Sequence, residues 1–326
     1  MGELYWYAIP GALFVVWMLL SMKLSRPDGV YATKVHPYRK VVAHVQPTKT
    51  ESAVAFDVAV DAEPFIAYMK KADGKFPVDY THAMVGAVGL ALIRHPELNR
   101  FISGGRFYQR SETVLSFAVK REKMNKAAAL APVKLTLEDG ETFAHLCHRI
   151  EGAITLERSG KKTYADKEFS LLNAIPRPAF WLTIRILKLL DYYNVLPGAF
   201  IKGDALYTGA FLANLGSLGM APAYHHLFEW GNCPIFLTMG AIEERAVVED
   251  GEVVAKTVLP GRFVFDERVC DGLTAWRCIQ SGLRAFEDPE THFGCLADDG
   301  SDHWPLGHEA SVDSRAHGPV TSPHRA

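Results

Sequence analysis

An apolar run at the N-terminus constrains this chain most, because a helix built from it would have no polar face. From Leu4 to Met22 the sequence contains no charged residue, and this length is close to the ~20 residues that a helix needs to cross a bilayer. Aromatic residues occupy positions 5–7 at one end, and Lys23 and Arg26 follow the other end, as interfacial anchors do. We therefore predict one transmembrane helix over residues 1–22, with the rest of the chain on the cytoplasmic side.

Two alternative interpretations fit this run less well. A cleaved signal peptide carries basic residues before its apolar core and small residues at its end, whereas the only charged residue before this run is Glu3. A buried N-terminal helix is less consistent with the length of the run and with its aromatic end. A single-pass membrane protein remains the expectation.

Composition excludes some classes of function. The net charge of −2 over 326 residues gives no basic surface for nucleic acid, so none is expected as a partner. The cysteines are scattered without a Cys-x-x-Cys pair, which argues against a disulfide framework or a zinc site. They are Cys147, Cys233, Cys270, Cys278 and Cys295. Residues 299–326 are polar and aperiodic, which predicts a disordered tail, and the histidines there lack metal-ligand spacing.

Strand and helix signals follow one another along the rest of the chain. Apolar residues alternate from Val54 to Val60, which indicates a half-buried strand. Asp250 and Gly251 form a strong two-residue hairpin signal. The other expected helices span about residues 61–71 (with Asp61 as N-cap), 80–95, 142–156 and 272–289, and the other expected strands span 115–119, 235–242, 246–248, 253–259 and 263–265.

An apolar insertion interrupts this pattern at residues 174–201. Its central helix carries only Arg185 and Lys188 as charges and is too short to span a membrane. Three interpretations remain open. It is a core helix, an interfacial helix lying on a membrane, or one wall of a hydrophobic acyl site.

Several segments, in order, resemble the catalytic domain of the dihydrolipoamide acyltransferases and the related chloramphenicol acetyltransferases. They are Tyr38-Arg39-Lys40-Val41-Val42, Leu90-Ala91-Leu92 with Pro96-Glu97-Leu98-Asn99, Asn214-Leu215-Gly216, Gly240-Ala241-Ile242-Glu243-Glu244-Arg245, the Asp250-Gly251 turn, and Arg262 through Cys270-Asp271-Gly272. Each motif is weak alone, but their order over residues 38–288 makes the resemblance specific.

The resemblance implies a fold, an assembly and a substrate. The fold would be an α/β two-layer sandwich, a mixed sheet with helices on one face, formed by residues 38–298 after a linker over 23–37. The assembly would be a homotrimer with active sites between subunits. Coenzyme A or acyl-CoA would be the substrate, with no metal.

Two positions depart from the catalytic pattern of that family. The histidine that removes a proton from the attacking thiol or hydroxyl is replaced by Glu267, and the serine that holds the oxyanion is replaced by Ala213. The frame around them is retained as Asn214, Asp271 and Gly272. General-base catalysis is worth ~10²–10⁴ in rate and one oxyanion donor ~10²–10³, so both losses matter.

Three residues are candidates for a replacement base. A carboxylate in a dry pocket can have its pKa raised towards neutrality, which makes Glu267 one candidate, although it could equally pair with an arginine and only hold its loop. His225 and His226 are the others, and because adjacent side chains point in different directions, at most one should face the site. Ser217 lies near Ala213 but at a different position of the loop.

Two functional hypotheses follow from these residues. The first is a membrane-anchored, trimeric, CoA-dependent acyltransferase that acts on a hydrophobic or lipidic acceptor, with Glu267 or His226 in the role of the base. The second is a catalytically inactive trimeric scaffold or acyl-CoA-binding protein. The losses at positions 213 and 267 favour the second, and the retained frame with the apolar insertion favours the first.

Overall fold

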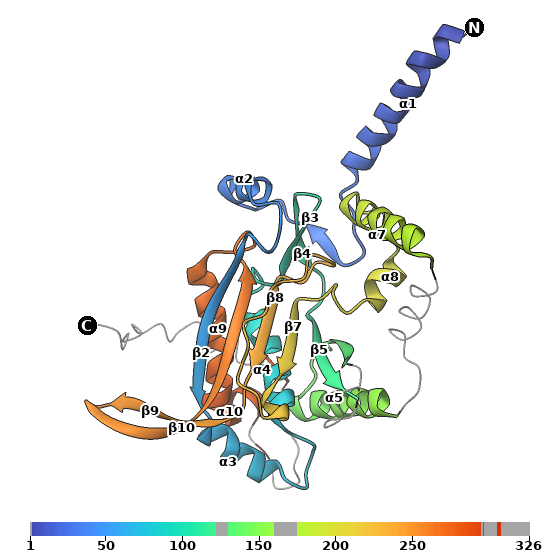
Figure 1. Cartoon of the computed structure of the whole chain (residues 1–326). Helices are drawn as coiled ribbons and strands as arrows, with labels where there is room; N and C mark the ends of the chain where they lie inside the picture. Colours follow the sequence, from blue (N-terminus) through green and yellow to red (C-terminus); the bar gives the residue numbers. More distant parts are fainter. Residues whose placement is uncertain (1, 122–129, 160–174, 295, 297–304, 308–326) are drawn as a thin grey trace.

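A seven-stranded mixed sheet forms the centre of the molecule (Figure 1). The computed structural model describes residues 2–121, 130–159, 175–294, 296 and 305–307, so most of the predicted tail over 299–326 lies outside the described residues. The strands are β2 (Ala53–Asp61), β5 (Val114–Lys120), β6 (Leu130–Thr136), β7 (Ala210–Asn214), β8 (Ile235–Met239), β9 (Glu243–Glu249) and β10 (Glu252–Asp266). Their order is β2-β10-β8-β7-β5-β6, with β9 paired to β10. The pairs β5–β7 and β7–β8 are parallel and the others are antiparallel.

Helices cover one face of this sheet (Figure 1). They are α3 (Glu63–Ala72), α4 (Tyr80–Arg94), α5 (Phe143–Arg158), α9 (Gly272–Glu287) and α10 (Pro289–Phe293). The main hydrophobic core lies between these helices and the sheet. The two-layer arrangement expected from the sequence is therefore confirmed.

Strand alternation sends side chains to two different environments. On β7, Ala210 and Leu212 belong to the main core under the helices. Phe211 and Ala213 point the other way and belong to a second, smaller cluster with Phe236 of β8. This follows from the two-residue period of a strand, and it places position 213 on the face that the main helices do not cover.

The hairpin predicted at Asp250 and Gly251 is confirmed. Both residues have positive φ, 51° and 86°, as a tight two-residue turn requires. The two strands expected over 253–259 and 263–265 are in fact one long strand, β10, because its backbone pairs continuously with β2 from Val258 to Asp266. Asp61 is the last residue of β2, and α3 begins after Ala62.

The segment predicted as a linker, residues 23–37, is structured. It contains β1 (Gly29–Tyr31), which joins β4 (Arg106–Arg110) and β3 (Arg100–Ser103) in a small second sheet. The side chain of Arg26 is 1% exposed and pairs with Asp28 and with Asp191. The helix α2 (Pro37–Val45) follows. Sequence periodicity missed β1 because it is only three residues long.

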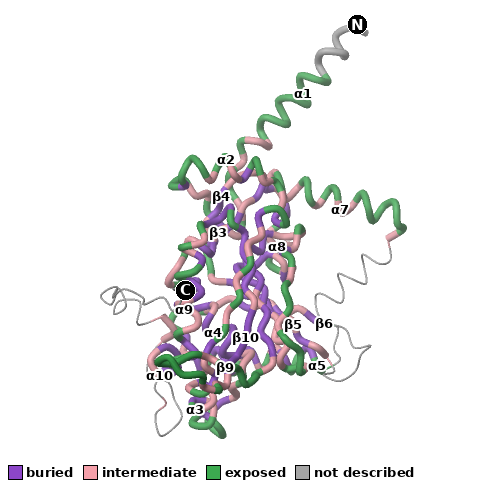
Figure 2. The backbone as a smooth tube through the Cα atoms, turned by 60° about the vertical axis from the view of Figure 1, so that its left-hand side comes forward, coloured by how far each residue is buried: buried purple, intermediate pink, exposed green. Residues whose placement is uncertain are grey.

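Two exposed apolar helices lie at one end of the molecule (Figures 1 and 2). The helix α1 (Gly2–Met22) projects away from the domain, and α7 (Arg177–Tyr192) lies beside its base, followed by α8 (Gly198–Gly203). No residue of α7 is buried, so the core-helix interpretation of the insertion is wrong.

The transmembrane helix predicted over residues 1–22 is not supported. No helix in the part of the chain that the structure describes is long and apolar enough to cross a membrane.

Candidate active site

A cavity of about 1170 Å³ is lined partly by side chains on the face of the sheet opposite the main helices and partly by α5 at the β6 edge. Phe211, Ala213 and Phe236 of the sheet form its floor. Its walls come from the inner side of α7, from the start of α4, from α5 and β6, and from the loop between β7 and β8. Ligand sites of this size are typically apolar with a few polar groups, and the lining here has that composition.

The end of β7 brings Ala213 and Asn214 to this cavity. Ala213 contributes a methyl group and no hydrogen-bond donor. Asn214 is held on both sides of its amide, because its Nδ2 donates to Thr81 Oγ1 at 3.0 Å and its Oδ1 accepts from the backbone N–H of Ser217 at 3.0 Å. The Ser217 hydroxyl donates to the Asn214 carbonyl at 2.8 Å, so its hydrogen already has an acceptor. Asn214 thus shapes the loop that follows β7.

His225 is the imidazole that lines the cavity. Its ring lies flat on Phe236, with ring centres 3.8 Å apart and an angle of 7° between the planes. Its Nδ1 lies 2.7 Å from the backbone carbonyl oxygen of His226. A carbonyl oxygen can only accept, so Nδ1 carries the hydrogen and Nε2 keeps a lone pair. Partial burial lowers the pKa of His225 below its usual 6.5, which keeps the ring neutral near pH 7.

His226 lies next to this ring but faces differently. Its side chain is exposed, it stacks on His225 with ring centres 4.6 Å apart, and it is not among the cavity-lining residues. The expectation that at most one of the two histidines faces the site agrees with this arrangement, and His225 is the one that does.

Glu267 lies in a different part of the chain's surface, on the loop between β10 and α9. Its side chain is exposed and its backbone N–H donates to the Ser52 carbonyl at 2.9 Å. Its neighbours form a buried ion pair, Asp266 with Arg268 at 2.8 Å, whose side chains are 2% and 5% exposed. Arg268 does not pair with Glu267, so the loop is held by the residues on either side of position 267.

Asp271 and Gly272 start the last long helix. Asp271 is the N-cap of α9, and its Oδ1 accepts from the Thr274 backbone N–H at 2.7 Å. That hydrogen bond lowers the pKa of Asp271, and Arg39 contacts its other oxygen at 3.4 Å. These contacts stabilise the start of α9. Asp271 therefore has a structural role here, and its presence does not require a role in the reaction.

Within one chain, the predicted site residues form two separate groups. Ala213, Asn214 and His225 share the cavity, whereas Glu267 and Asp271 do not line it. The family resemblance places active sites between subunits, so the two groups could meet only across a contact between copies. The catalytic roles of Glu267 and His226 therefore stay predictions.

Sequence reasoning missed two polar contributions to the cavity. Lys134 of β6 donates its Nζ to the carbonyls of Ile201 and Asp204 at 2.7 and 2.9 Å, and burial lowers its pKa to about 8. Asp79, the N-cap of α4, also lines the wall. Burial alone would raise its pKa, but hydrogen bonding and charge from His82 hold the pKa of Asp79 at about 2. The Asp79 N-cap could have been found, since aspartate before a long helical run is a recognised signal.

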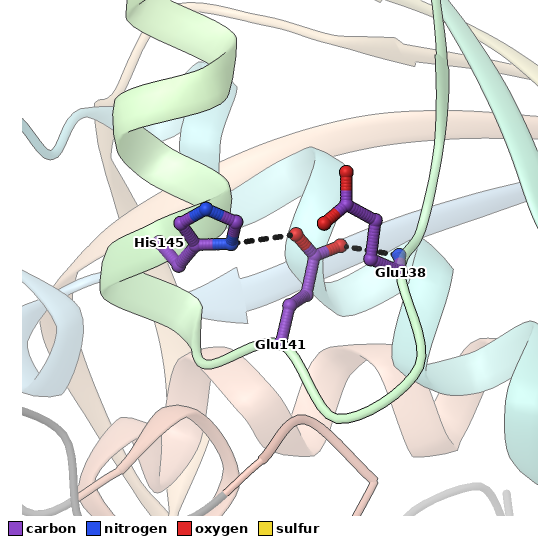
Figure 3. A group of neighbouring side chains, drawn as sticks. All are labelled: Glu138, Glu141 and His145. Atoms are coloured by element: carbon purple, nitrogen blue, oxygen red, sulfur yellow. Dashed lines mark hydrogen bonds and ion pairs between the residues drawn. The ribbon is translucent and has the colours of Figure 1, made fainter.

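Glu138, Glu141 and His145 form a cluster (Figure 3), and none of the three is among the residues that line this cavity. The potential ligand atoms lie within 4.8 Å of one another. However, Arg149 donates to Glu141 at 2.7 Å and contacts Glu138 at 3.2 Å. A cation would have to compete with this guanidinium, so we interpret the cluster as an ion-pair network at the start of α5.

Comparisons with known proteins agree with the fold and with the C-terminal motifs. The sequence model of the 2-oxoacid dehydrogenases acyltransferase (catalytic domain) matches residues 208–293. The acetyltransferase component of the pyruvate dehydrogenase complex from Bacillus subtilis is 25% identical over 279 residues, which are 81% of this chain and 52% of that protein. The chain thus spans about half the length of this relative.

Solved structures show the same architecture. A probable dihydrolipoamide acetyltransferase from Listeria monocytogenes is 18% identical, with a TM-score of 0.52 over 78% of this chain and 94% of that one. The cubic core of a pyruvate dehydrogenase multienzyme complex is 14% identical, with a TM-score of 0.51 over 80% of this chain and 94% of that one. By its fold, and by the sequence of residues 208–293, this chain is similar to the catalytic domains of the 2-oxoacid dehydrogenase acyltransferases.

Proposed function

We propose that the protein transfers an acyl group between coenzyme A and a hydrophobic partner, with His225 as the general base. The observation that carries this proposal is the fixed tautomer of His225, whose Nδ1 is bound to the His226 carbonyl. Its Nε2 is thereby left as a neutral acceptor on a ring that lines a large cavity. A base of this kind needs a lone pair, reach to the reacting proton and a pKa near or below the working pH.

The chemical step balances with this single base. Nε2 takes the proton of the acceptor hydroxyl or thiol as its oxygen or sulfur attacks the thioester carbonyl. The tetrahedral intermediate then expels the coenzyme A thiolate, which recovers the proton from the imidazolium. The products are the acylated acceptor and free coenzyme A.

The wall of the cavity supports a hydrophobic substrate. Phe180, Ile184 and Leu187 of α7 line it together with Phe211 and Phe236 of the sheet. Aromatic and aliphatic walls of this extent suit an acyl chain, since burial of apolar surface is the main source of its binding energy. The polar groups at the end of β7 would orient the head of the substrate.

One observation favours the alternative, an acyl-CoA-binding protein without transferase activity. Position 213 has no donor, and the nearby Ser217 hydroxyl is engaged with Asn214. Without a donor at the oxyanion, a transferase would lose ~10²–10³ in rate. The homotrimer implied by the family resemblance is part of both proposals, because that resemblance also implies active sites between subunits.

Calorimetric titration of the full chain with coenzyme A and with a long-chain acyl-CoA tests the cavity. We expect saturable binding near one site per chain and tighter binding of the acylated form. Ala213→Phe should weaken acyl-CoA binding by at least tenfold because it fills the cavity floor. Val248→Phe, on the exposed β9 strand, is the matched control. Equal binding by all three proteins, or none by a correctly assembled wild type, would contradict a substrate site here.

A further inference from the structure

The bases of α1 and α7 are locked together by a buried polar network. Arg26 Nη1 donates to the Asp191 carbonyl and to Asn194 Oδ1, at 3.2 and 3.1 Å, and its Nη2 pairs with Asp191 Oδ1 at 2.9 Å. Asn194 Nδ2 in turn donates to the Lys23 carbonyl at 2.8 Å. Arg106 adds a hydrogen bond to the Ser21 carbonyl. The C-terminal end of α1 is therefore fixed to the end of α7.

The outward side of α7 carries two stripes at helical spacing. Leu182, Ile186 and Leu189 form an apolar stripe at positions i, i+4 and i+7, a spacing that puts them on one helix face. All are exposed, at 51%, 46% and 56%. Beside them run Trp181, Arg185, Lys188 and Tyr192, also exposed. The Arg185 guanidinium lies 4.8 Å from the centre of the Trp181 ring.

The charge of this surface has one sign. Arg177, Arg185 and Lys188 are the cations of α7, and its single acidic residue, Asp191, is already paired with Arg26. An apolar stripe flanked by cations and aromatic rings is the composition of helices that lie in a bilayer interface, where anionic headgroups meet the cations. Two copies packed through this face would bring like charges together, which disfavours a protein dimer here.

The described part of α1 extends the same surface. From Ile9 to Leu19 no side chain is charged, and every residue is exposed. Helix α1 leaves the domain at the end where α7 lies (Figures 1 and 2). Two apolar helices joined at their bases thus present unpartnered surfaces at one end of the protein.

We propose that α1 and the outward face of α7 form one contact surface for an anionic lipid bilayer. In this arrangement α1 supplies apolar side chains to the acyl region, and α7 lies flat with its cations among the headgroups. The opposite side of α7 lines the cavity through Ile184 and Leu187. If the proposed function holds, a single helix separates the substrate site from the membrane, and a lipid-derived acyl chain is the substrate class that this placement serves.

Co-sedimentation of the full chain with vesicles tests the surface, with phosphatidylcholine alone compared with phosphatidylcholine containing phosphatidylglycerol. We expect wild-type protein to prefer the anionic vesicles. Arg185→Ala with Lys188→Ala should reduce that preference by about tenfold to 30-fold, while Lys70→Ala with Arg277→Ala, which removes exposed cations from α3 and α9, should not. Leu182→Asp with Leu189→Asp should weaken binding to both vesicle types, and Val248→Asp with Val253→Asp is its control on the β9–β10 hairpin.

An unchanged anionic preference in the Arg185/Lys188 variant, or unchanged binding in the Leu182/Leu189 variant, overturns the proposal. So does a change of oligomeric state in either variant without loss of vesicle binding, which would assign the face to a second copy. Melting curves check that each variant is folded. Because vesicle binding is measured without coenzyme A, a failure of the proposed acyl transfer would leave this result unaffected.

Discussion

The two places where the family resemblance expects catalytic residues are built in opposite ways. At the end of β7 the structure is hollow, and Ala213 and His225 line a cavity of about 1170 Å³. At the loop before α9 the structure is solid, because Asp266 and Arg268 form a buried pair and Asp271 caps the helix. The departures from the family pattern at positions 213 and 267 therefore have different structural consequences. At position 267 the fold needs no particular side chain, whereas at position 213 any added atom enters the cavity.

His225 is the residue on which the proposed role of the cavity depends most. His225→Gln removes the basic lone pair, and we expect acyl transfer to fall by ~10²–10⁴ with little change in acyl-CoA binding. In the wild type, the neutral form of His225 is required and burial lowers its pKa below 6.5. The midpoint of the fall in rate with decreasing pH should therefore lie below pH 6.5. A midpoint above pH 6.5 would assign the base to another group.

Removing one member of the Asp266–Arg268 pair should destabilise the loop before α9. Arg268→Ala leaves the Asp266 carboxylate buried without its partner, so we expect a loss of roughly 3–5 kcal/mol in the free energy of unfolding. Urea denaturation measures this change. A loss below about 1 kcal/mol, typical of exposed pairs, would show that the loop is not held by this contact.

Restoring a hydrogen-bond donor at position 213, on the cavity floor, should have the next largest effect. Ala213→Ser returns a hydroxyl to the cavity floor, and we expect the transfer rate to rise by up to ~10²–10³ if the reacting carbonyl lies there. Ala213→Val, which adds volume without a donor, is the control. A serine variant no faster than the valine variant places the reacting carbonyl elsewhere.

Glu267→Gln should have the smallest effect. The side chain is exposed and the loop uses only its backbone N–H and carbonyl, so we expect a change within about 0.5 kcal/mol in stability and an unchanged transfer rate. Abolished transfer with intact assembly would instead make Glu267 the base, acting on the cavity of a neighbouring copy.

Sequence reasoning anticipated the parts of the fold that repeat a period. The strand through Val58, the helix from Tyr80 and the hairpin at Gly251 are all present. It missed the short strands β1, β3 and β4. Strands β3 and β4 form a local hairpin, and β1 pairs with β4 far along the chain. Residues 23–37 were expected to be a linker, although Arg26 in this segment has polar partners far along the chain.

The candidate site could be predicted only in part. Motif order located Ala213 and Asn214 at the end of a strand, and the adjacent histidines suggested that one would face the site. Which histidine does so depends on the contact between His225 and Phe236, a tertiary packing that no local pattern encodes. The separation of Glu267 from the cavity also depends on the arrangement of strands, because Ala213 and Glu267 belong to two motifs that lie far apart in the sequence.

The Arg26 network has a consequence for the order in which the chain folds. Its contact with Asp191 joins residues 165 positions apart, and closure of so long a loop is entropically expensive before other contacts have formed. We therefore expect the junction of α1 and α7 to be completed last, after the central sheet. Pulsed hydrogen exchange should show late protection of the Asn194 and Val195 amides relative to those of β8. The two apolar helices would then acquire their fixed positions relative to each other only after the central domain has formed.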